Sequence, residues 1–104
     1  MSAYFLADVS VDNLQAYQAS GYVAAVPGIA AKFGGKYVAR GGEVRVLEGD
    51  WPTDRFIIVE FPDMAKLQAF CDSEEYAPWK KVRQSLASSK VIAVEGLAET
   101  LDVG

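Results

Sequence analysis

The sequence contains no histidine and only one cysteine, Cys71. The absence of histidine excludes zinc fingers, histidine-ligated iron sites, and Ser-His-Asp or Cys-His nucleophiles. A lone cysteine has no partner for a disulfide within the chain, which is typical of a reducing compartment, and we interpret Cys71 as a small core residue on a helix. The side chains left for chemistry are carboxylates, arginine, tyrosine, serine and lysine.

Excess positive charge and long apolar runs are also missing. Ten basic residues against 14 acidic ones give a net charge of −4, and the longest basic run is Lys80-Lys81. Nucleic acids and anionic membranes are therefore poor partners. The apolar run at residues 4–7 stops at Asp8, far short of a signal peptide or a membrane-spanning helix. We expect a cytoplasmic protein.

The length and composition indicate one domain with a real core. The chain has 104 residues, of which 51% are hydrophobic, and domains typically contain about 100–200 residues. We predict a single domain over residues 1–104, with its core in residues 3–96 and a C-terminal tail at residues 97–104.

The first half of the chain reads as strand, helix and one or two strands. Residues 4–11 predict a strand, and an apolar stripe at helical spacing predicts a helix over 13–33, interrupted or kinked at Pro27 and ended by Gly34-Gly35. Residues 36–40 and 43–48 are strand-like and are joined by Gly41-Gly42, which predicts a hairpin or a bent second strand.

The second half repeats the alternation of strand and helix. Residues 55–61 (RFIIVEF) give the strongest strand pattern and predict a central strand. Asp63 and Ser73 are expected to cap two helical segments, the second over 74–86, and residues 90–95 predict the last strand.

This order predicts a ferredoxin-like α+β fold, in which a four-stranded antiparallel sheet carries its helices on one face. The uncovered face is apolar as well, since Phe56 and Ile58 alternate with Ile57 and Val59. A soluble monomer rarely exposes such a patch. We therefore expect a homodimer whose two sheets pack face to face.

Strand alternation sorts the side chains into two faces. It predicts apolar residues under the helices, and the strand carboxylates on the opposite face: Phe5, Ala7, Val9, Ile57, Val59, Phe61, Ile92 and Val94 against Asp8, Glu60 and Glu95. Arg40 is the cation expected to join the carboxylates. Proximity and burial would raise a carboxyl pKa and allow general acid/base catalysis. The alternative is that these groups are solvated or ion-paired at strand ends.

A second candidate group lies on the late helix. Tyr76, Trp79, Lys80 and Arg83 are spaced i, i+3, i+4 and i+7, which places them along one side. Arg83 together with Arg40 would hold a carboxylate, with Tyr76 and Trp79 as apolar walls. The alternative is that Trp79 belongs to the core and the cations form a solvated edge.

Several motifs in order resemble a known family. Residues 33–42 (FGGKYVARGG), 47–51 (LEGDW), 59–62 (VEFP), 72–76 (DSEEY) and 94–96 (VEG), with Arg83, resemble the uncharacterised family called domain of unknown function 1330. The resemblance implies a small bacterial protein with a ferredoxin-like subunit, assembled as a dimeric α+β barrel. The wider superfamily includes cofactor-free monooxygenases, isomerases, haem-degrading enzymes and ligand sensors, which typically use the cleft between sheet and helices. The chain has no histidine to bind haem.

These observations predict a small-molecule-binding protein without metal or cofactor. In its enzymatic form it is a cofactor-independent isomerase-like or monooxygenase-like enzyme acting on a small organic acid. Arg40 and Arg83 would hold the anion, Glu60, Asp8 or Glu95 would move a proton, and Tyr76 and Trp79 would shape the pocket. The alternative is a non-catalytic ligand-binding or interaction module.

Overall fold

Four antiparallel strands form one sheet in the computed structural model, which describes residues 1–97. The strands are β1 (Ala3–Val11), β2 (Lys36–Arg40), β3 (Arg55–Phe61) and β4 (Ala87–Glu95), in the order β2-β3-β1-β4. The prediction that residues 55–61 form a central strand is therefore confirmed. Of the predicted tail, residues 98–104 lie outside the described residues.

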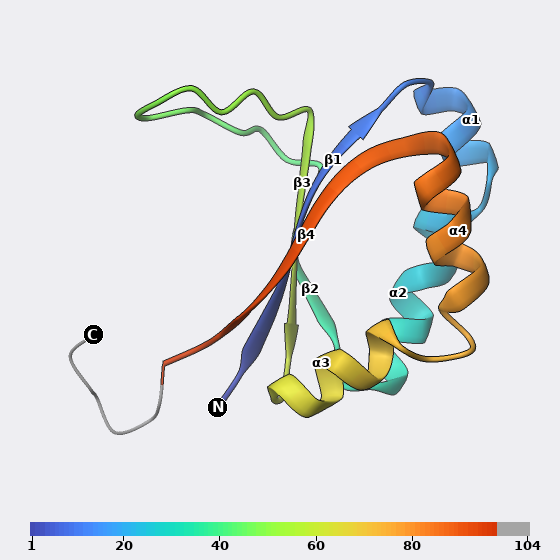
Figure 1. Ribbon diagram of the computed structural model, residues 1–104, viewed down its shortest axis with the longest axis vertical. Coiled ribbons are helices and arrows are strands. Elements are labelled where there is room, and N and C mark those ends of the chain that lie inside the picture. Colours follow the sequence, from blue (N-terminus) through green and yellow to red (C-terminus); the bar gives the residue numbers. More distant parts are fainter. Residues whose placement is uncertain (98–104) are drawn as a thin grey trace.

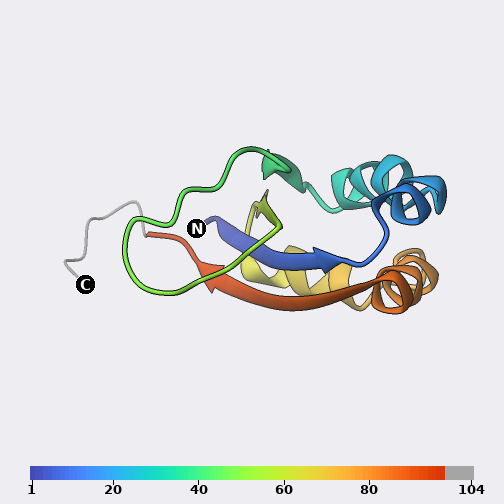
Figure 2. The same ribbon diagram turned by 90° about the horizontal axis from the view of Figure 1, so that it is seen from above.

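Four helices cover one face of this sheet and leave the other uncovered (Figures 1 and 2). They are α1 (Leu14–Ala19), α2 (Tyr22–Lys32), α3 (Met64–Cys71) and α4 (Ala77–Leu86). The predicted ferredoxin-like α+β arrangement is confirmed: the helix expected over 13–33 is divided into α1 and α2, and the two helical segments expected after β3 are α3 and α4.

The core lies between the helices and the two central strands. Alternate residues of β1 and β3 point under the helices and are buried, as predicted: Phe5, Ala7 and Val9, and Ile57, Val59 and Phe61. Phe70 of α3 contacts four other rings, those of Phe5, Phe33, Phe61 and Tyr76. Burial of these side chains, at about 25 cal/mol per Å² of apolar surface, is the main force that holds the helices on the sheet.

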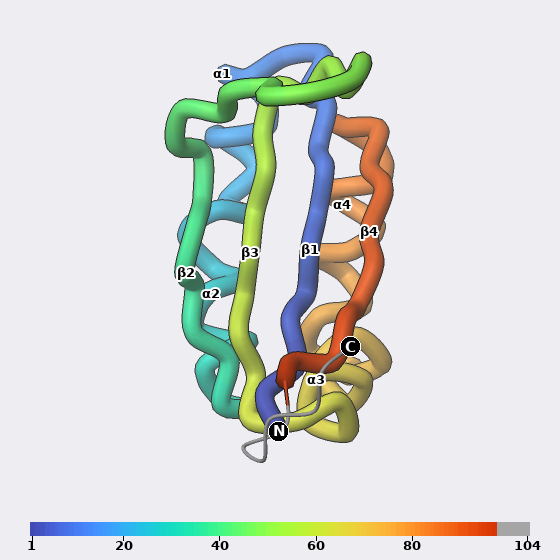
Figure 3. The backbone as a smooth tube through the Cα atoms, turned by 90° about the vertical axis from the view of Figure 1, so that its left-hand side faces the viewer, coloured from blue at the N-terminus to red at the C-terminus, as the bar shows by residue number. Residues whose placement is uncertain are grey.

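We call the other side of the sheet the open face. The pairing register places on it one set of residues from each of the three longer strands: Tyr4, Leu6 and Asp8, Phe56, Ile58 and Glu60, and Lys90, Ile92 and Val94. Ile92 is 62% exposed and Val94 46% exposed. The prediction of an apolar uncovered face is confirmed; Figure 3 shows the backbone of the sheet from this side.

The face predicted for β4 is wrong. Ile92 pairs with Leu6, and Val94 with Tyr4, so both residues lie on the open face and not under the helices. Glu95 pairs with buried Ala3, which places Glu95 on the helix side. The predicted strand began at Lys90, whereas β4 begins at Ala87 directly after α4.

The interruption predicted at Pro27 falls elsewhere. The first helical segment breaks at Gly21, whose φ of 87° lies in the left-handed region, and Pro27 sits inside α2. Proline has no N–H to donate to the carbonyl four residues earlier, which is that of Val23. Arg40 Nη1 donates to this oxygen instead, at 3.4 Å.

Residues 43–48 do not form the predicted second strand. Residues 41–54 contain no helix or strand, and we call this segment the arm. Pairing between β2 and β3 ends at Arg40 and Ile57, so the arm has no neighbouring strand with which to bond.

The helix ends follow local chemistry. Asp63 Oδ1 accepts from the Lys66 N–H at 2.8 Å, which confirms the predicted cap. Gly34, with φ of 81°, ends α2 as predicted, because the Gly35 N–H returns to the Ala30 carbonyl.

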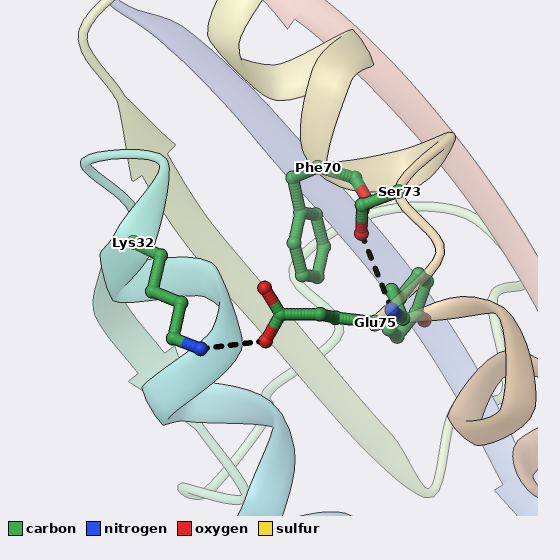
Figure 4. Close-up of polar contacts among 5 residues, drawn as sticks. Lys32, Phe70, Ser73 and Glu75 are labelled. Carbon is green, nitrogen blue, oxygen red and sulfur yellow. Dashed lines mark hydrogen bonds and ion pairs between the residues drawn. The ribbon is translucent and has the colours of Figure 1, made fainter.

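Ser73 acts one turn before α4 and not as its cap, since the helix starts at Ala77. Its hydroxyl accepts from the Tyr76 N–H at 3.2 Å, and the neighbouring Glu75 pairs with Lys32 of α2 at 2.6 Å (Figure 4). These contacts hold Tyr76 at the entry of α4.

Candidate functional site

The helix side of the sheet gathers an unusual set of polar side chains. Three of the four arginines and four of the five tyrosines of the chain lie there. We call this group the tyrosine–arginine cluster: Tyr17, Tyr22, Tyr37, Tyr76, Arg40, Arg55 and Arg83. Tyrosine hydroxyls and guanidinium groups are hydrogen-bond donors suited to an anion.

Arg83 is the charged member of the buried core. It is 6% exposed, and no other charged side chain among residues 1–97 is buried. Its Nη1 donates to Ser89 Oγ on β4, its Nε has no partner, and neither ion pair of the described chain involves it. Burial by itself lowers the pKa of Arg83, but Tyr76 and Tyr22 outweigh it, so the pKa is raised and the guanidinium stays charged. A buried cation without a carboxylate partner is costly unless an anion joins it.

Two tyrosines meet beside this cation. The hydroxyl oxygens of Tyr22 and Tyr76 are 2.7 Å apart, and Tyr76 stacks on Phe70 with ring centroids 4.5 Å apart. Burial raises the pKa of Tyr22 far above its ordinary value, and Tyr76 raises it further. Tyr22 is therefore a proton donor and not a base near neutral pH.

Tyr17 and Arg55 complete the inner part of the cluster. Tyr17 is fully buried, and its hydroxyl has no hydrogen-bond partner; nor has the buried Nε of Arg55. Burial raises the pKa of Tyr17, while the charges of Arg55 and Arg83 act in the opposite direction. Arg55, Val9 and Ser89 lie directly opposite one another on β3, β1 and β4, so Arg55 and the partner of Arg83 share one row across the sheet.

Arg40 lies at the exposed edge of the cluster and not among the carboxylates. A β-bulge in β2 between Tyr37 and Ala39 pairs Tyr37 with Val59 and Arg40 with Ile57, which turns both toward the helices. The Arg40 guanidinium carbon lies 5.3 Å from the centroid of the Tyr37 ring. Burial raises the pKa of Tyr37 to about 12, with Tyr76 adding to the rise and Arg40 opposing it.

The three predicted carboxylates do not come together. Asp8 and Glu60 share the open face, but Asp8 pairs with Phe56 and Glu60 with Tyr4. Four residues of strand separate those pairs, or about 13 Å. Glu95 lies on the other face of the sheet. The expected carboxylate site with Arg40 is therefore wrong as a geometry.

Each open-face carboxylate has its own local partners. Asp8 accepts from Trp51 Nε1 at 2.8 Å and from Thr53 Oγ1 at 2.6 Å. The Thr53 bond first, and then the Trp51 bond, lower the pKa of Asp8. Glu60 accepts from the Tyr4 hydroxyl at 3.1 Å, which raises the pKa of Tyr4.

The late-helix group is divided. Tyr76 and Arg83 are buried in the cluster, whereas Lys80 is exposed. Trp79 is half-buried and packs over the Gly21 turn, where a side-chain carbon added to Gly21 would lie 3.5 Å from Trp79 Cη2. Trp79 is thus a packing residue, which agrees with the alternative that it belongs to the core.

Sequence patterns missed Tyr17, Tyr22, Tyr37 and Arg55 as members of the site. Tyr17 and Tyr22 fall within the apolar helical stripe of residues 13–33, although each carries a hydroxyl that must be satisfied when buried. Arg55 was the one charged residue on the helix side of the central strand, and its alternation with Ile57, Val59 and Phe61 was the available signal.

Two cavities of about 350 Å³ each lie on the open face. One is walled by the arm, including Val44, Val46 and Leu47, and the other by Leu6, Asp8 and Ile92. Both include Trp51 and Phe56, whose rings meet edge to face with centroids 5.8 Å apart.

Two further properties concern metals and membranes. Among residues 1–97, no three Cys, Asp or Glu side chains are grouped to hold a metal ion. No helix in that part of the chain is long and apolar enough to cross a membrane.

Comparison with solved structures finds the same fold in several proteins. A protein of unknown function from Rhodopseudomonas palustris is 23% identical, with a TM-score of 0.70 over 93% of this chain and 83% of that one. A dimeric ferredoxin-like protein of unknown function from Jannaschia sp. is 15% identical, with a TM-score of 0.69 over 92% of this chain and 100% of the other. SnoaB, a cofactor-independent oxygenase from Streptomyces nogalater, is 15% identical, with a TM-score of 0.66 over 97% and 98%.

No curated protein matches the sequence. Residues 2–97, nearly the whole chain, match the family described as Domain of unknown function (DUF1330). The family resemblance found in the motifs is confirmed, and the likeness to the solved structures extends to the fold. The chain belongs to the DUF1330 family.

Proposed function

We propose that the protein binds a small organic acid at the tyrosine–arginine cluster, between the sheet and the helices. The observation that carries this proposal is Arg83, a buried guanidinium with no carboxylate partner among the described residues. Beside it, the Tyr17 hydroxyl and the Arg55 Nε are buried donors without acceptors. A carboxylate would supply the missing acceptors and offset the buried charge.

The cluster reaches solvent at the β2 edge of the sheet. Arg40 is exposed, Tyr37 is half-buried, and Arg83 is buried, so the cationic groups extend from surface to interior. This gradient favours attraction of an anion from solvent before its desolvation. Phe70 and the tyrosine rings supply the apolar walls that a small-molecule site needs.

Thermal unfolding with a panel of small carboxylic acids, each paired with its uncharged amide, tests the proposal. A ligand at ten times its dissociation constant adds about 1.4 kcal/mol, or several degrees for a chain of this size. We expect acids, but not amides, to raise Tm. The rise should disappear in Arg83→Met and persist in Lys80→Met, which removes an exposed cation from the same helix. A rise that survives Arg83→Met would contradict the proposal.

In its enzymatic form, the proposal is a cofactor-independent acid/base reaction of the isomerase or monooxygenase type. SnoaB, which shares the fold, is described as a cofactor-independent oxygenase. Here hydroxide from solvent would remove the α-proton of the bound acid as water, Arg83 would stabilise the enolate, and the Tyr22–Tyr76 hydroxyl pair would donate a proton to its carbon and regain one from water. Asp8 and Glu60 lie on the open face, so we propose tyrosine in place of carboxylate as the proton donor.

Solvent deuterium exchange into an enolisable keto acid, followed by NMR, tests this form. Tyr76→Phe should slow exchange without abolishing binding. If the wild-type protein binds the acid but exchanges no faster than solution, the non-catalytic alternative, a ligand-binding module, holds.

We also propose that the protein is a homodimer. The apolar open face supports this, because Ile92 and Val94 remain exposed on it. The Jannaschia protein of the same fold is described as dimeric. Face-to-face packing of two sheets would cover these residues.

A further inference from the structure

The arm, residues 41–54, is the most exposed apolar segment of the described chain. Leu47 is 89% exposed, Val46 52%, Val44 42% and Trp51 57%. The arm projects to the side of the sheet opposite the helices (Figure 1) and crosses in front of the ends of β3 and β1 (Figure 3). Its apolar side chains therefore stand over the open face, where the proposed second copy would pack.

Two of the five charged side chains of the arm neutralise each other. Arg45 pairs with Glu43 within the arm, with Nε and Oε1 3.2 Å apart. Val44 lies between Glu43 and Arg45 in the sequence, and Val46 and Leu47 follow Arg45. All three apolar side chains are exposed to solvent. The apolar side chains beside this self-paired couple are suited to the centre of an interface, whereas Glu48, Asp50 and Asp54 add three acidic groups to the arm.

Three hydrogen bonds tie the far end of the arm to β1, one from Ser10 to Asp54 at 3.2 Å and two to Asp8. Asp8 Oδ2 accepts from Trp51 Nε1 at 2.8 Å, and Oδ1 accepts from Thr53 Oγ1 at 2.6 Å. Both oxygens of one carboxylate thus hold two residues of the arm, and the Trp51 ring rests edge-on against Phe56. We call this contact the latch.

The latch also shapes the two open-face cavities. Trp51 and Phe56 wall both of them, and each cavity is open to solvent in the single chain. Apolar surface left in water costs about 25 cal/mol per Å². Side chains of a second copy would fill this space.

We infer that the arm is a dimer clasp: Val44, Val46 and Leu47 pack against Ile92 and Val94 of a second copy, while Asp8 holds the arm in place through Trp51 and Thr53. The inference rests on the proposed homodimer. A two-fold axis makes the contact reciprocal, so that each chain gives one arm and receives one. Asp8 is then a positioning residue of an interface and not a proton carrier.

Sedimentation of the full chain over a dilution series tests the inference. We expect the wild type to sediment with twice the 11.3 kDa mass of one chain, and the Ile92→Glu variant to sediment as a monomer. Leu47→Glu should raise the dimer dissociation constant about tenfold or more, as a central interface residue does. Leu14→Glu is the matched control, since Leu14 is 50% exposed but lies on α1, away from the open face, and its dissociation constant should not change.

The latch has its own variant and readout. Asp8→Ala should raise the dissociation constant several-fold, and Glu75→Gln, which removes a carboxylate on the helix side, should not. In a Trp79→Phe background Trp51 is the remaining tryptophan. Its emission should shift to the red on dilution of the dimer and should already be shifted in Asp8→Ala.

The outcomes separate the two proposals. A wild type that sediments as one chain at every concentration overturns both the homodimer and the clasp. A wild-type dimer disrupted by Ile92→Glu but unchanged by Leu47→Glu and Asp8→Ala supports the dimer and overturns the clasp. Circular dichroism of each variant identifies any loss of fold.

Discussion

The Tyr22 and Tyr76 hydroxyl oxygens, 2.7 Å apart in the buried core, join α2 to the entry of α4. The pair lies between residues 54 positions apart in the sequence. Each hydroxyl is the hydrogen-bond partner of the other, so their contributions to the free energy of unfolding are coupled.

Removing both hydroxyls should therefore lower the free energy of unfolding by less than the sum of the two single removals. Tyr22→Phe leaves the buried Tyr76 hydroxyl without this partner, and we expect a loss of about 1–3 kcal/mol in the free energy of unfolding. The double variant Tyr22→Phe/Tyr76→Phe should recover part of that loss, which urea unfolding will measure as a coupling energy. Tyr4→Phe, at the partly buried Tyr4–Glu60 contact on the open face, should change stability by less than about 0.5 kcal/mol.

The buried tyrosines also predict alkaline instability. The pKa of Tyr37 rises from 10.0 to about 12, and that of Tyr22 rises further. Above pH 10 the unfolded chain loses phenolic protons that the folded chain keeps, so stability falls as the pH rises through this window. Each such tyrosine contributes about 1.4 kcal/mol per pH unit there. Urea midpoints from pH 9 to 12 should fall less steeply for Tyr22→Phe; an equal slope would contradict the prediction.

Arg83→Met should cost little stability in the absence of a ligand. The guanidinium is buried without a carboxylate, so its desolvation is poorly offset, and methionine replaces it with an apolar chain of similar length. We expect the free energy of unfolding to stay within about 1 kcal/mol of the wild type or to rise. A loss of 3 kcal/mol or more would indicate that Arg83 serves the fold and not a ligand.

Two glycines of the same helical region should respond in opposite ways. A side-chain carbon at Gly34, where φ is 81°, would lie 2.6 Å from Pro62 Cγ, so Gly34→Ala should destabilise the chain by at least about 2 kcal/mol. A side-chain carbon added to Gly28, which lies inside α2, would meet no atom within 4 Å outside the backbone of its own helix. Gly28→Ala should stabilise the chain by about 0.5–1 kcal/mol, because alanine favours a helix. Thermal unfolding of the two variants checks both signs.

The elements that the sequence predicted well are those whose signals are local. Five of the seven residues of β3 are β-branched or aromatic, and Asp63 caps α3 through an N–H three residues away. Face assignment failed where the phase of alternation was ambiguous. Residues 91–94 of β4 are all apolar, so either phase of the alternation would place two of them on the helix side. Only the pairing with β1 determines which two.

The site was predicted in part for a related reason. Tyr76 and Arg83 share a helix, and their spacing was visible in the sequence. Asp8 and Glu60 were placed on the correct face, but their distance along the sheet depends on the β1–β3 register. Arg40 was assigned by simple alternation, which the bulge at Val38 breaks. The unpartnered hydroxyl of Tyr17 follows from tertiary packing, and no local pattern encodes it.

The bulge in β2 gives this strand one residue more than its pairing uses. Tyr37 and Arg40 lie opposite Val59 and Ile57, two positions apart on β3, although they are three apart on β2. A chain that lost Val38 would keep the same partners in a regular ladder. Most strands reverse their inner and outer surfaces when they lose a residue, whereas β2 would become shorter while Arg40 kept its place beside the tyrosines. At this edge of the sheet, the chain can therefore lose one residue without reversing which side chains of β2 face the helices.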